Sequence, residues 1–257
     1  MEVATWIETL RDEGARMTAA ARATSADAPV PTCPEWMSRD LIRHTGGIHR
    51  WATRFVAEAR AEPGSQTLEE VAGGWPGNEE LADWFEAGYI GLVAALEAAP
   101  PDLQCWTFLP APSPLAMWSR RQAHETAIHR VDAELTAGRT LDHLSPFTPA
   151  FAADGVDELL TCFVPRRSTG LKSESPATLG IECADDEGAW VLTIGPHGVT
   201  TTAGATSASG QSDCIVRGAA GDLSMALWNR GRDKRLQVNG DRAVLDLFGD
   251  AVQVRWS

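Results

Sequence analysis

Hydrophobic residues recur at the spacing of amphipathic helices through about the first 140 residues of the chain. The first such stretch covers residues 2–24. A second is expected to begin at Ser38 as its N-cap, and a third at Asn78 as its N-cap. The fourth covers about residues 116–137 and ends before Gly138, a favourable residue just after a helix. Four helices of this length predict a helical bundle.

The second and third helices each carry one apolar stripe, and a long loop rich in proline and glycine, residues 63–77, is expected between them. The stripe of the second helix contains Leu41, His44, Ile48, Trp51 and Phe55. That of the third contains Leu81, Trp84, Phe85, Ile90, Leu92, Val93 and Leu96. Five tryptophans are expected in the core, one of them able to line a pocket wall: Trp36, Trp51, Trp84, Trp106 and Trp118.

After a fifth helix at about residues 149–164, the pattern changes to short runs typical of strands. Strands are expected at residues 176–183, 189–194, 199–202, 214–218 and 236–238, with a turn at 239–241 and a last strand at Val252–Trp256. Helices are expected at 219–229 and 241–248. The predicted class is α+β, with a helical bundle at residues 1–150 and a smaller α/β domain at residues 151–257.

The balance of charge narrows the classes of partner. The chain has 22 basic and 35 acidic residues, a formal net charge of −13. A field of this sign repels nucleic-acid phosphates and anionic membranes. Neither an apolar run of membrane-spanning length nor an apolar N-terminal signal segment is found, so we expect a cytoplasmic protein.

The cysteines argue against sulfur chemistry supplied by the chain itself. There are five, widely spaced and without a C-x-x-C pair, so neither a disulfide framework nor a thiolate zinc site is indicated. We expect most of them to be buried thiols. Chemistry that needs a soft sulfur would then require an external thiol.

Two of the predicted helices carry four of the six histidines. His124 and His129 are five positions apart, which places them about 140° apart around a helix and excludes the H-E-x-x-H arrangement of metalloproteases. Glu125 and His129 are four apart and can point into one cavity. Of His44 and His49, also five apart, His44 lies on the apolar stripe and is the one expected to face the bundle centre.

His44, Glu125 and His129 therefore form a candidate set of two histidines and one carboxylate. This set suits Zn²⁺ with coordination positions left open, although Fe²⁺, Mn²⁺ or Ni²⁺ would also fit. Two simpler readings stay open: Glu125 and His129 form a surface helix pair, and His44 is a hydrogen-bonded core histidine. His49 and His124 are expected to face solvent or a domain boundary.

Two segments carry a family resemblance: the run from Pro31 to Trp51, and the run His124-Glu125-Thr126-Ala127-Ile128-His129-Arg130-Val131-Asp132-Ala133-Glu134. Together they resemble the mycothiol-dependent maleylpyruvate isomerase family, whose metal-binding domain is a DinB-like four-helix bundle. The likeness extends to a C-terminal α/β domain through Cys214–Gly218 and the run Leu227-Trp228-Asn229-Arg230. The resemblance implies that His44, Glu125 and His129 are the metal ligands.

The resemblance also implies a reaction assisted by mycothiol, the small thiol of actinobacteria. A bound Zn²⁺ stabilises a thiolate, which adds to an activated alkene. Rotation and elimination then give isomerisation, whereas omitting them gives an S-conjugate. Two other hypotheses use the same residues: a hydrolase that activates metal-bound water, and a metal-binding scaffold or sensor that performs no reaction.

Three further residues have secondary predicted roles. Arg230 matches the family's "W-x-R" turn and is expected to bind a carboxylate of the small-molecule substrate or of the thiol; Arg217 is a weaker candidate. The alternative, which the sequence favours, is that the cation-rich segment 230–235 is a solvated turn after a helix. Asp132 is expected to pair locally, for instance with Arg130, in preference to orienting a ligand.

Overall fold

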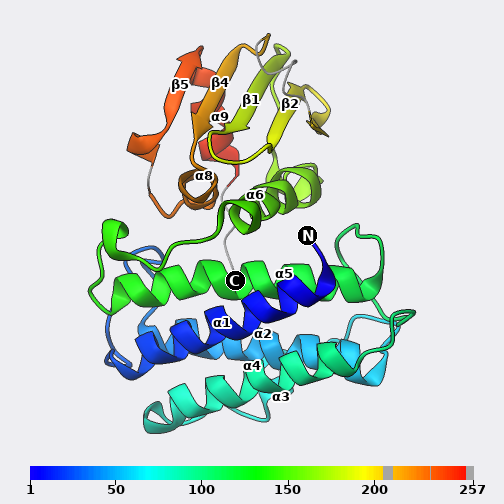
Figure 1. Cartoon of the computed structure of the whole chain (residues 1–257), viewed down its shortest axis with the longest axis vertical. Helices are drawn as coiled ribbons and strands as arrows, with labels where there is room; N and C mark the ends of the chain where they lie inside the picture. The colour runs from blue at the N-terminus through cyan, green and yellow to red at the C-terminus, as the bar shows by residue number, and fades with distance from the viewer. Residues whose placement is uncertain (205–210, 232, 253–257) are drawn as a thin grey trace. The chain divides into compact units, whose positions relative to one another are not determined.

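The computed structural model describes residues 1–204, 211–231 and 233–252, with Arg167 described by its backbone alone. The chain divides into two compact units, Met1–Ser145 and Pro146–Ser257. The first is helical, and the second contains a five-stranded sheet (Figure 1). The predicted α+β class is confirmed.

Four long helices form the first unit: α1 (Val3–Arg22), α2 (Ser38–Glu58), α4 (Leu81–Ala98) and α5 (Pro114–Thr136). α1 packs against α4 and α5, and α2 packs against the same two helices, so the four close into a bundle (Figure 1). The four long helices predicted from hydrophobic spacing are therefore present.

The segment between α2 and α4, predicted as a loop, contains the short helix α3 (Leu68–Ala72). Its start is a reciprocal cap. The Thr67 hydroxyl accepts from the Glu70 backbone N–H, and the Glu70 carboxylate accepts from the Thr67 N–H. Gly73, in the left-handed region at φ 76°, follows the helix. The T-x-x-E spacing was the signal for this helix, and the loop prediction missed it.

Neither predicted N-cap is the observed one, which is Met37 for α2 and Glu80 for α4. Ser38 is already helical, and the residue before it, Met37, donates its backbone N–H to the Asp40 carboxylate at 2.9 Å. Asn78 opens the 3₁₀ turn η1 (Asn78–Glu80), which runs into α4. Ile90, expected in the apolar stripe of this helix, is 52% exposed.

The 3₁₀ turn η2 (Leu141–His143) lies beyond α5.

α5 is buried along most of its length, including many of its polar residues. The buried polar and charged residues are Ser119, Arg121, Gln122, His124, Glu125, Thr126, His129, Arg130, Asp132 and Glu134. Buried polar groups require partners. The candidate chemistry of the protein therefore concentrates on this helix.

The second unit begins with α6 (Pro149–Glu158), continued by a π-helical turn, η3 (Leu159–Phe163), and the 3₁₀ turn η4 (Arg167–Thr169). Five strands follow: β1 (Ala177–Cys183), β2 (Ala189–Gly195), β3 (Gly198–Ala203), β4 (Cys214–Gly218) and β5 (Gln237–Gly240). Their order is β3-β2-β1-β4-β5, with β1 and β4 parallel and the other neighbours antiparallel. The remaining elements are α8 (Ala220–Leu227), η5 (Asp233–Arg235) and α9 (Arg242–Ala251).

One face of the sheet is buried against α6 and the turn that continues it. Trp190 on β2 donates from its indole N–H to Asp157 of α6, and the Thr201 hydroxyl on β3 donates to the Leu160 carbonyl. The buried side chains on this face are Leu179, Ile181, Trp190, Leu192, Ile194 and Val216. Along β2 they alternate with less buried residues, as the period-two pattern predicts, whereas on β1 the intervening Gly180 is buried as well.

Two predictions near the C-terminus have different outcomes. The turn predicted at residues 239–241 is wrong in position, because β5 continues to Gly240, which pairs with Cys214. Gly240 has φ 94°, and a Cβ there would collide with the Asp213 carbonyl, so this strand end requires glycine. The predicted last strand, Val252–Trp256, lies outside the described residues except for Val252, which ends α9.

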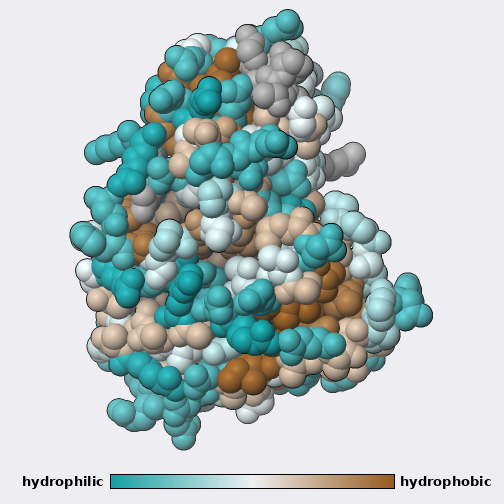
Figure 2. Space-filling model, viewed as in Figure 1, coloured by the Kyte–Doolittle hydropathy of each residue, from teal (hydrophilic) through white to brown (hydrophobic). Residues whose placement is uncertain are grey.

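The surface in Figure 2 is largely hydrophilic, with a brown apolar patch over the N-terminal part of α1. A groove of about 670 Å³ lies in the same region, bounded by α1, the end of α4 and the start of α5. Its apolar lining includes Val3, Ile7, Leu96 and Leu115. None of the predicted metal ligands lines it.

Two further expectations from the sequence concern membrane-spanning helices and the cysteines. No helix among the described residues combines the length and apolar character needed to cross a membrane. All five cysteines are free: Cys162, Cys183 and Cys214 are buried, as expected of most of them, and Cys33 and Cys105 are partly exposed.

Candidate metal centre

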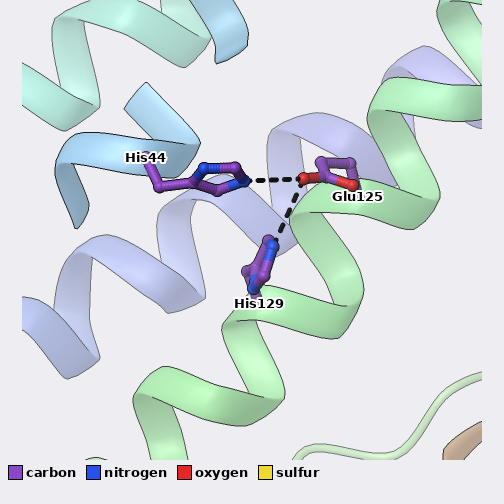
Figure 3. Close-up of side chains that lie close together, drawn as sticks. All are labelled: His44, Glu125 and His129. Carbon is purple, nitrogen blue, oxygen red and sulfur yellow. Dashed lines mark hydrogen bonds and ion pairs between the residues drawn. The ribbon is translucent and has the colours of Figure 1, made fainter. Parts of the chain in front are cut away.

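The three predicted ligands come together in the helical bundle. His44 projects from α2, and Glu125 and His129 project one turn apart from α5, so that all three point toward one another (Figure 3). Glu125 Oε1 lies 3.4 Å from His44 Nε2 and 3.3 Å from His129 Nε2. One potential ligand atom from each residue lies within 4.8 Å of the other two.

Burial excludes the reading of Glu125 and His129 as a surface helix pair. The side chains of Glu125 and His129 are 2% and 0% exposed, whereas that of His44 is 15% exposed. The group is therefore enclosed by protein with one partly open side, at His44. This matches a catalytic metal site, which needs protein ligands and an accessible coordination position.

A second carboxylate fixes the orientation of His129. The Asp132 Oδ2 atom lies 2.9 Å from His129 Nδ1, and its Oδ1 atom accepts a hydrogen bond from the Thr32 hydroxyl at 2.5 Å. An N–H on Nδ1 pointing at Asp132 leaves Nε2 facing Glu125. The expected local pair of Asp132 is therefore found with His129, three positions earlier on α5, while Arg130 binds Glu13 and Glu134.

An arginine binds the second oxygen of Glu125. Arg121 lies one turn earlier on α5, and its Nη2 donates to Glu125 Oε2 at 2.8 Å. Both side chains are 2% exposed. The sequence analysis assigned no role to Arg121, although its i,i+4 spacing to Glu125 was a signal for this pair.

The charges of the cluster follow from these contacts. Burial alone would raise the pKa of Glu125, but the charge of His129, hydrogen bonds from His129 and His44, and the charge of Arg121 together hold it well below its usual value. Burial lowers the pKa of His44, so its imidazole is neutral. Burial also disfavours the charged form of His129, but Glu125 and Asp132 outweigh it and raise its pKa. A cation that binds at His129 Nε2 competes with a proton for that atom.

The spacing of the donor atoms fits a tetrahedral cation. Bonds of about 2.0–2.1 Å from Zn²⁺ to nitrogen and oxygen place neighbouring ligand atoms roughly 3.3 Å apart. The Glu125 oxygen lies 3.4 and 3.3 Å from the two imidazole nitrogens. The donor set, one carboxylate oxygen with two imidazole nitrogens, also suits zinc. The three residues therefore fit a divalent metal without rearrangement of the helices.

A loop between α1 and α2 supplies one wall of the site. The Trp36 ring lies 4.9 Å from the His44 ring and 6.1 Å from the His129 ring, between centroids. Its loop is held by a hydrogen bond from Val30 N to Trp36 O and by a β-bridge between Pro29 and Met37. Trp36 is thus the tryptophan at the wall. Of the others, Trp51, Trp106 and Trp118 pack with Phe55 in an aromatic cluster.

His49 and His124 do not face solvent, which was one of the two surroundings predicted for them. His49 is 0% and His124 is 7% exposed. The Nε2 of His49 donates to the Thr126 hydroxyl at 2.8 Å, because that hydroxyl itself donates to the Gln122 carbonyl. α2 packs against α3, α4 and α5, so side chains on more than one face of it are buried. The stripe argument assumed a single buried face.

His49 makes the stability of the bundle depend on pH. Burial lowers its pKa from 6.5 to about 3. Between these values the unfolded chain takes up a proton that the folded chain does not, so stability falls as pH is lowered through this interval, by at most about 1.4 kcal/mol per pH unit. His49→Gln keeps an N–H donor for Thr126 but does not titrate. Urea unfolding at pH 6 and pH 5, with chelator present, should show a shallower pH dependence for this variant.

The exposed His143 offers a matched control. His143→Gln should keep the pH dependence of the wild-type protein. Equal slopes for wild-type protein and His49→Gln would contradict the assignment of His49 as a buried neutral histidine.

Arg230 belongs to the second unit, where it is 5% exposed and donates from Nη1 to the Trp228 carbonyl at 2.7 Å. It lies between two residues in the left-handed region, Asn229 at φ 61° and Gly231 at φ 83°. The reading of this residue as part of a solvated turn is wrong; its carboxylate-binding role stays a prediction. Arg217 on β4 is exposed, and Arg232 lies outside the described residues.

Comparison with known proteins gives consistent matches along the chain. Residues 7–134 match the family model described as the mycothiol maleylpyruvate isomerase N-terminal domain, and residues 150–247 match the MDMPI C-terminal domain. No curated protein sequence gives a significant match.

Among solved structures, a crystal structure of the mycothiol-dependent maleylpyruvate isomerase is similar, with a TM-score of 0.62, 14% identity and 93% of each chain covered. The structure of a histidine-to-alanine mutant of a mycothiol-dependent maleylpyruvate isomerase is also similar, with a TM-score of 0.60, 13% identity and 93% of each chain covered. At this identity the structural likeness shows the fold, and the two family models cover most of the sequence. The chain belongs to the mycothiol maleylpyruvate isomerase family of enzymes.

Proposed function

We propose that this protein is a zinc-dependent enzyme that activates mycothiol, or a related small thiol, for isomerisation or S-transfer on a small electrophilic substrate. The observation that carries the proposal is the convergence of His44 Nε2, His129 Nε2 and Glu125 Oε1 in a cluster that is buried except for the partly exposed His44. Family membership supports the thiol and the isomerase class.

The residues of the site have different proposed roles. His44, Glu125 and His129 would hold the cation, which when bound stabilises a thiolate at neutral pH. Asp132 keeps the His129 Nε2 atom directed at the cation, and Trp36 closes one side of the pocket with an apolar ring. The thiolate would add to an activated double bond of the substrate, rotation would follow about the resulting single bond, and loss of the thiol would restore the alkene.

The proposed substrate is a small carboxylate-bearing alkene such as maleylpyruvate, the compound after which the similar solved enzyme is named. Arginine suits carboxylates through its paired N–H groups. We propose Arg230 as the group that binds a carboxylate of substrate or thiol. Arg230→Lys and Arg230→Met should raise the KM for that partner more than they lower kcat.

The experiment is metal analysis of the purified protein, followed by turnover of maleylpyruvate at increasing mycothiol concentration, with and without chelator. We expect bound zinc, and a rate that rises with thiol concentration and is lost on chelation. Absence of any bound divalent metal would reject the proposal. Metal-dependent hydrolysis without thiol would identify a hydrolase instead, and bound metal without turnover of a panel of thiol acceptors would identify a binding scaffold.

Asp132 gives a prediction that needs no substrate. Asp132→Asn should weaken zinc binding by about 10–100-fold, the usual effect of removing a carboxylate that orients a ligating histidine. Thr32→Val, which removes only the hydrogen bond to Asp132, should have a smaller effect in the same direction. Competition with a chelating dye measures the affinities. Asp142→Asn, at an exposed aspartate, is the control, and an Asp132→Asn affinity within twofold of wild type would contradict the orienting role.

A further inference from the structure

We propose that Arg121 is a positioning residue that restricts Glu125 to one metal-binding oxygen and so reserves a coordination position for an anionic sulfur. This inference rests on the proposed function, since it concerns the same metal site. It adds Arg121 to the residues that act on this site, and it gives a reason why one coordination position of the metal stays open.

The two oxygens of Glu125 have different surroundings. Oε1 faces both imidazoles, 3.4 Å from His44 Nε2 and 3.3 Å from His129 Nε2. Oε2 accepts a hydrogen bond from Arg121 Nη2 at 2.8 Å. A carboxylate left free could offer both oxygens to one cation, whereas here the second oxygen already has a charged donor. Coordination through both oxygens would require breaking that bond.

The ion pair between Arg121 and Glu125 is expected to persist when a metal binds. Arginine stays charged at all relevant pH values, and a hydrogen bond between two ions is stronger than one between neutral groups. Both side chains are 2% exposed, so water does not compete freely for either. The residues lie one turn apart on α5, which is buried along most of its length, so the backbone also fixes their separation.

Two consequences follow for a bound divalent cation. Three protein donors, one from each residue, leave the fourth position of a tetrahedron open. The charges of Arg121 and Asp132 are opposite and offset each other, so the cation with Glu125 keeps a net positive charge. Such a site favours an anion such as a thiolate over neutral water.

Arg121 could instead serve only to neutralise a buried carboxylate. That role predicts loss of stability without any change in coordination. A role in positioning predicts that removing Arg121 lets Glu125 bind through both oxygens and occupy the position meant for sulfur. The coordination number and the affinity for a thiol distinguish the two roles, and neither measurement uses turnover.

The test uses full-length protein loaded with Co²⁺, whose visible absorption reports coordination number, and titrates it with N-acetylcysteine. Sulfur binding is followed by the near-ultraviolet charge-transfer band. The variants are Arg121→Met, which keeps an unbranched side chain but removes the charge, and Arg121→Lys, which keeps the charge without the guanidinium. Arg120→Met, at the neighbouring and partly exposed arginine, is the matched control.

For wild-type protein and Arg120→Met we expect a spectrum with a strong charge-transfer band on addition of the thiol. Arg121→Met should bind the thiol about tenfold more weakly or worse, as expected for loss of a group that orients a ligand, with a visible spectrum of higher coordination number before thiol is added. Its affinity for Co²⁺ should change far less than its affinity for the thiol. The thiol affinity of Arg121→Lys should lie between those of wild-type protein and Arg121→Met.

Unchanged thiol affinity and an unchanged spectrum in Arg121→Met would overturn the inference and leave Arg121 a stabilising residue. If that variant fails to fold, a crystal structure of zinc-loaded wild-type protein decides the matter. One Glu125 oxygen on the metal supports the inference and two overturn it. A wild-type protein that binds neither Co²⁺ nor Zn²⁺ would contradict the proposed function itself.

Discussion

Replacing His44 or His129 with alanine is expected to remove bound zinc and to lower thiol-dependent turnover by about a thousandfold or more. Each histidine supplies one of three ligands, and two remaining donors do not hold the cation at catalytic concentrations. The Lewis-acid contribution of a metal, several kcal/mol, is then lost from the transition state. Elemental analysis and rates at saturating thiol measure the two effects.

His44→Ala is the cleaner of the two variants, because its side chain is 15% exposed and its loss leaves a smaller cavity than loss of the fully buried His129. His143→Ala, at an exposed histidine of the same unit, controls for the loss of an imidazole and should keep its zinc. Circular dichroism checks folding. Zinc content equal to wild type in both ligand variants would reject the site.

The largest effect on stability is expected from Arg130, which lies at the centre of a buried ion cluster. Its Nε contacts Glu13 Oε2 at 2.5 Å and its Nη1 contacts Glu134 Oε2 at 3.2 Å, and its side chain is 0% exposed. Arg130→Met would leave two buried carboxylates without this partner. Breaking a buried ion pair from one side costs about 3–5 kcal/mol, a large share of the stability of an ordinary domain.

Urea unfolding of wild-type protein and Arg130→Met measures the loss, with Arg11→Met as the control. Arg11 forms an ion pair with Glu97 in which both side chains are about half exposed, so its replacement should cost less than about 1 kcal/mol. Adding Glu13→Gln to Arg130→Met should recover part of the loss by removing one stranded carboxylate. A loss for Arg130→Met no larger than that for Arg11→Met would show that the cluster does not stabilise the fold.

Much of the architecture could be predicted from local patterns. The four long helices follow from hydrophobic spacing, and β1, β2, β3 and β4 follow from short apolar runs between turn residues. The pairing of Glu125 with His129 follows from helix geometry alone, because residues four apart lie one turn from each other. The choice of His44 over His49 as their partner depended on which stripe each histidine joins.

The surroundings of the site could not be predicted in the same way. His49 was expected to be accessible, but α2 packs against three other helices and buries it. Asp132 was expected to pair locally, and it does contact His129 on the same helix, but its other partner is the loop residue Thr32, a hundred positions earlier in the chain. A sequence shows which residues are near along a helix and does not show which loop reaches it.

By itself, the sequence determined the α+β class, the lengths of the main helices and the presence of two histidines and a carboxylate suited to a divalent metal. These properties depend on the periodicity of apolar residues and on i,i+4 spacing, both of which are local. The tertiary structure alone decided that the Glu125 oxygen lies 3.4 and 3.3 Å from the two imidazole nitrogens, that Arg121 and Asp132 bind outer atoms of Glu125 and His129, and that the Trp36 ring lies beside the two imidazoles. Those features depend on how helices and a loop distant in sequence pack together, because packing sets distance, burial and charge at the site.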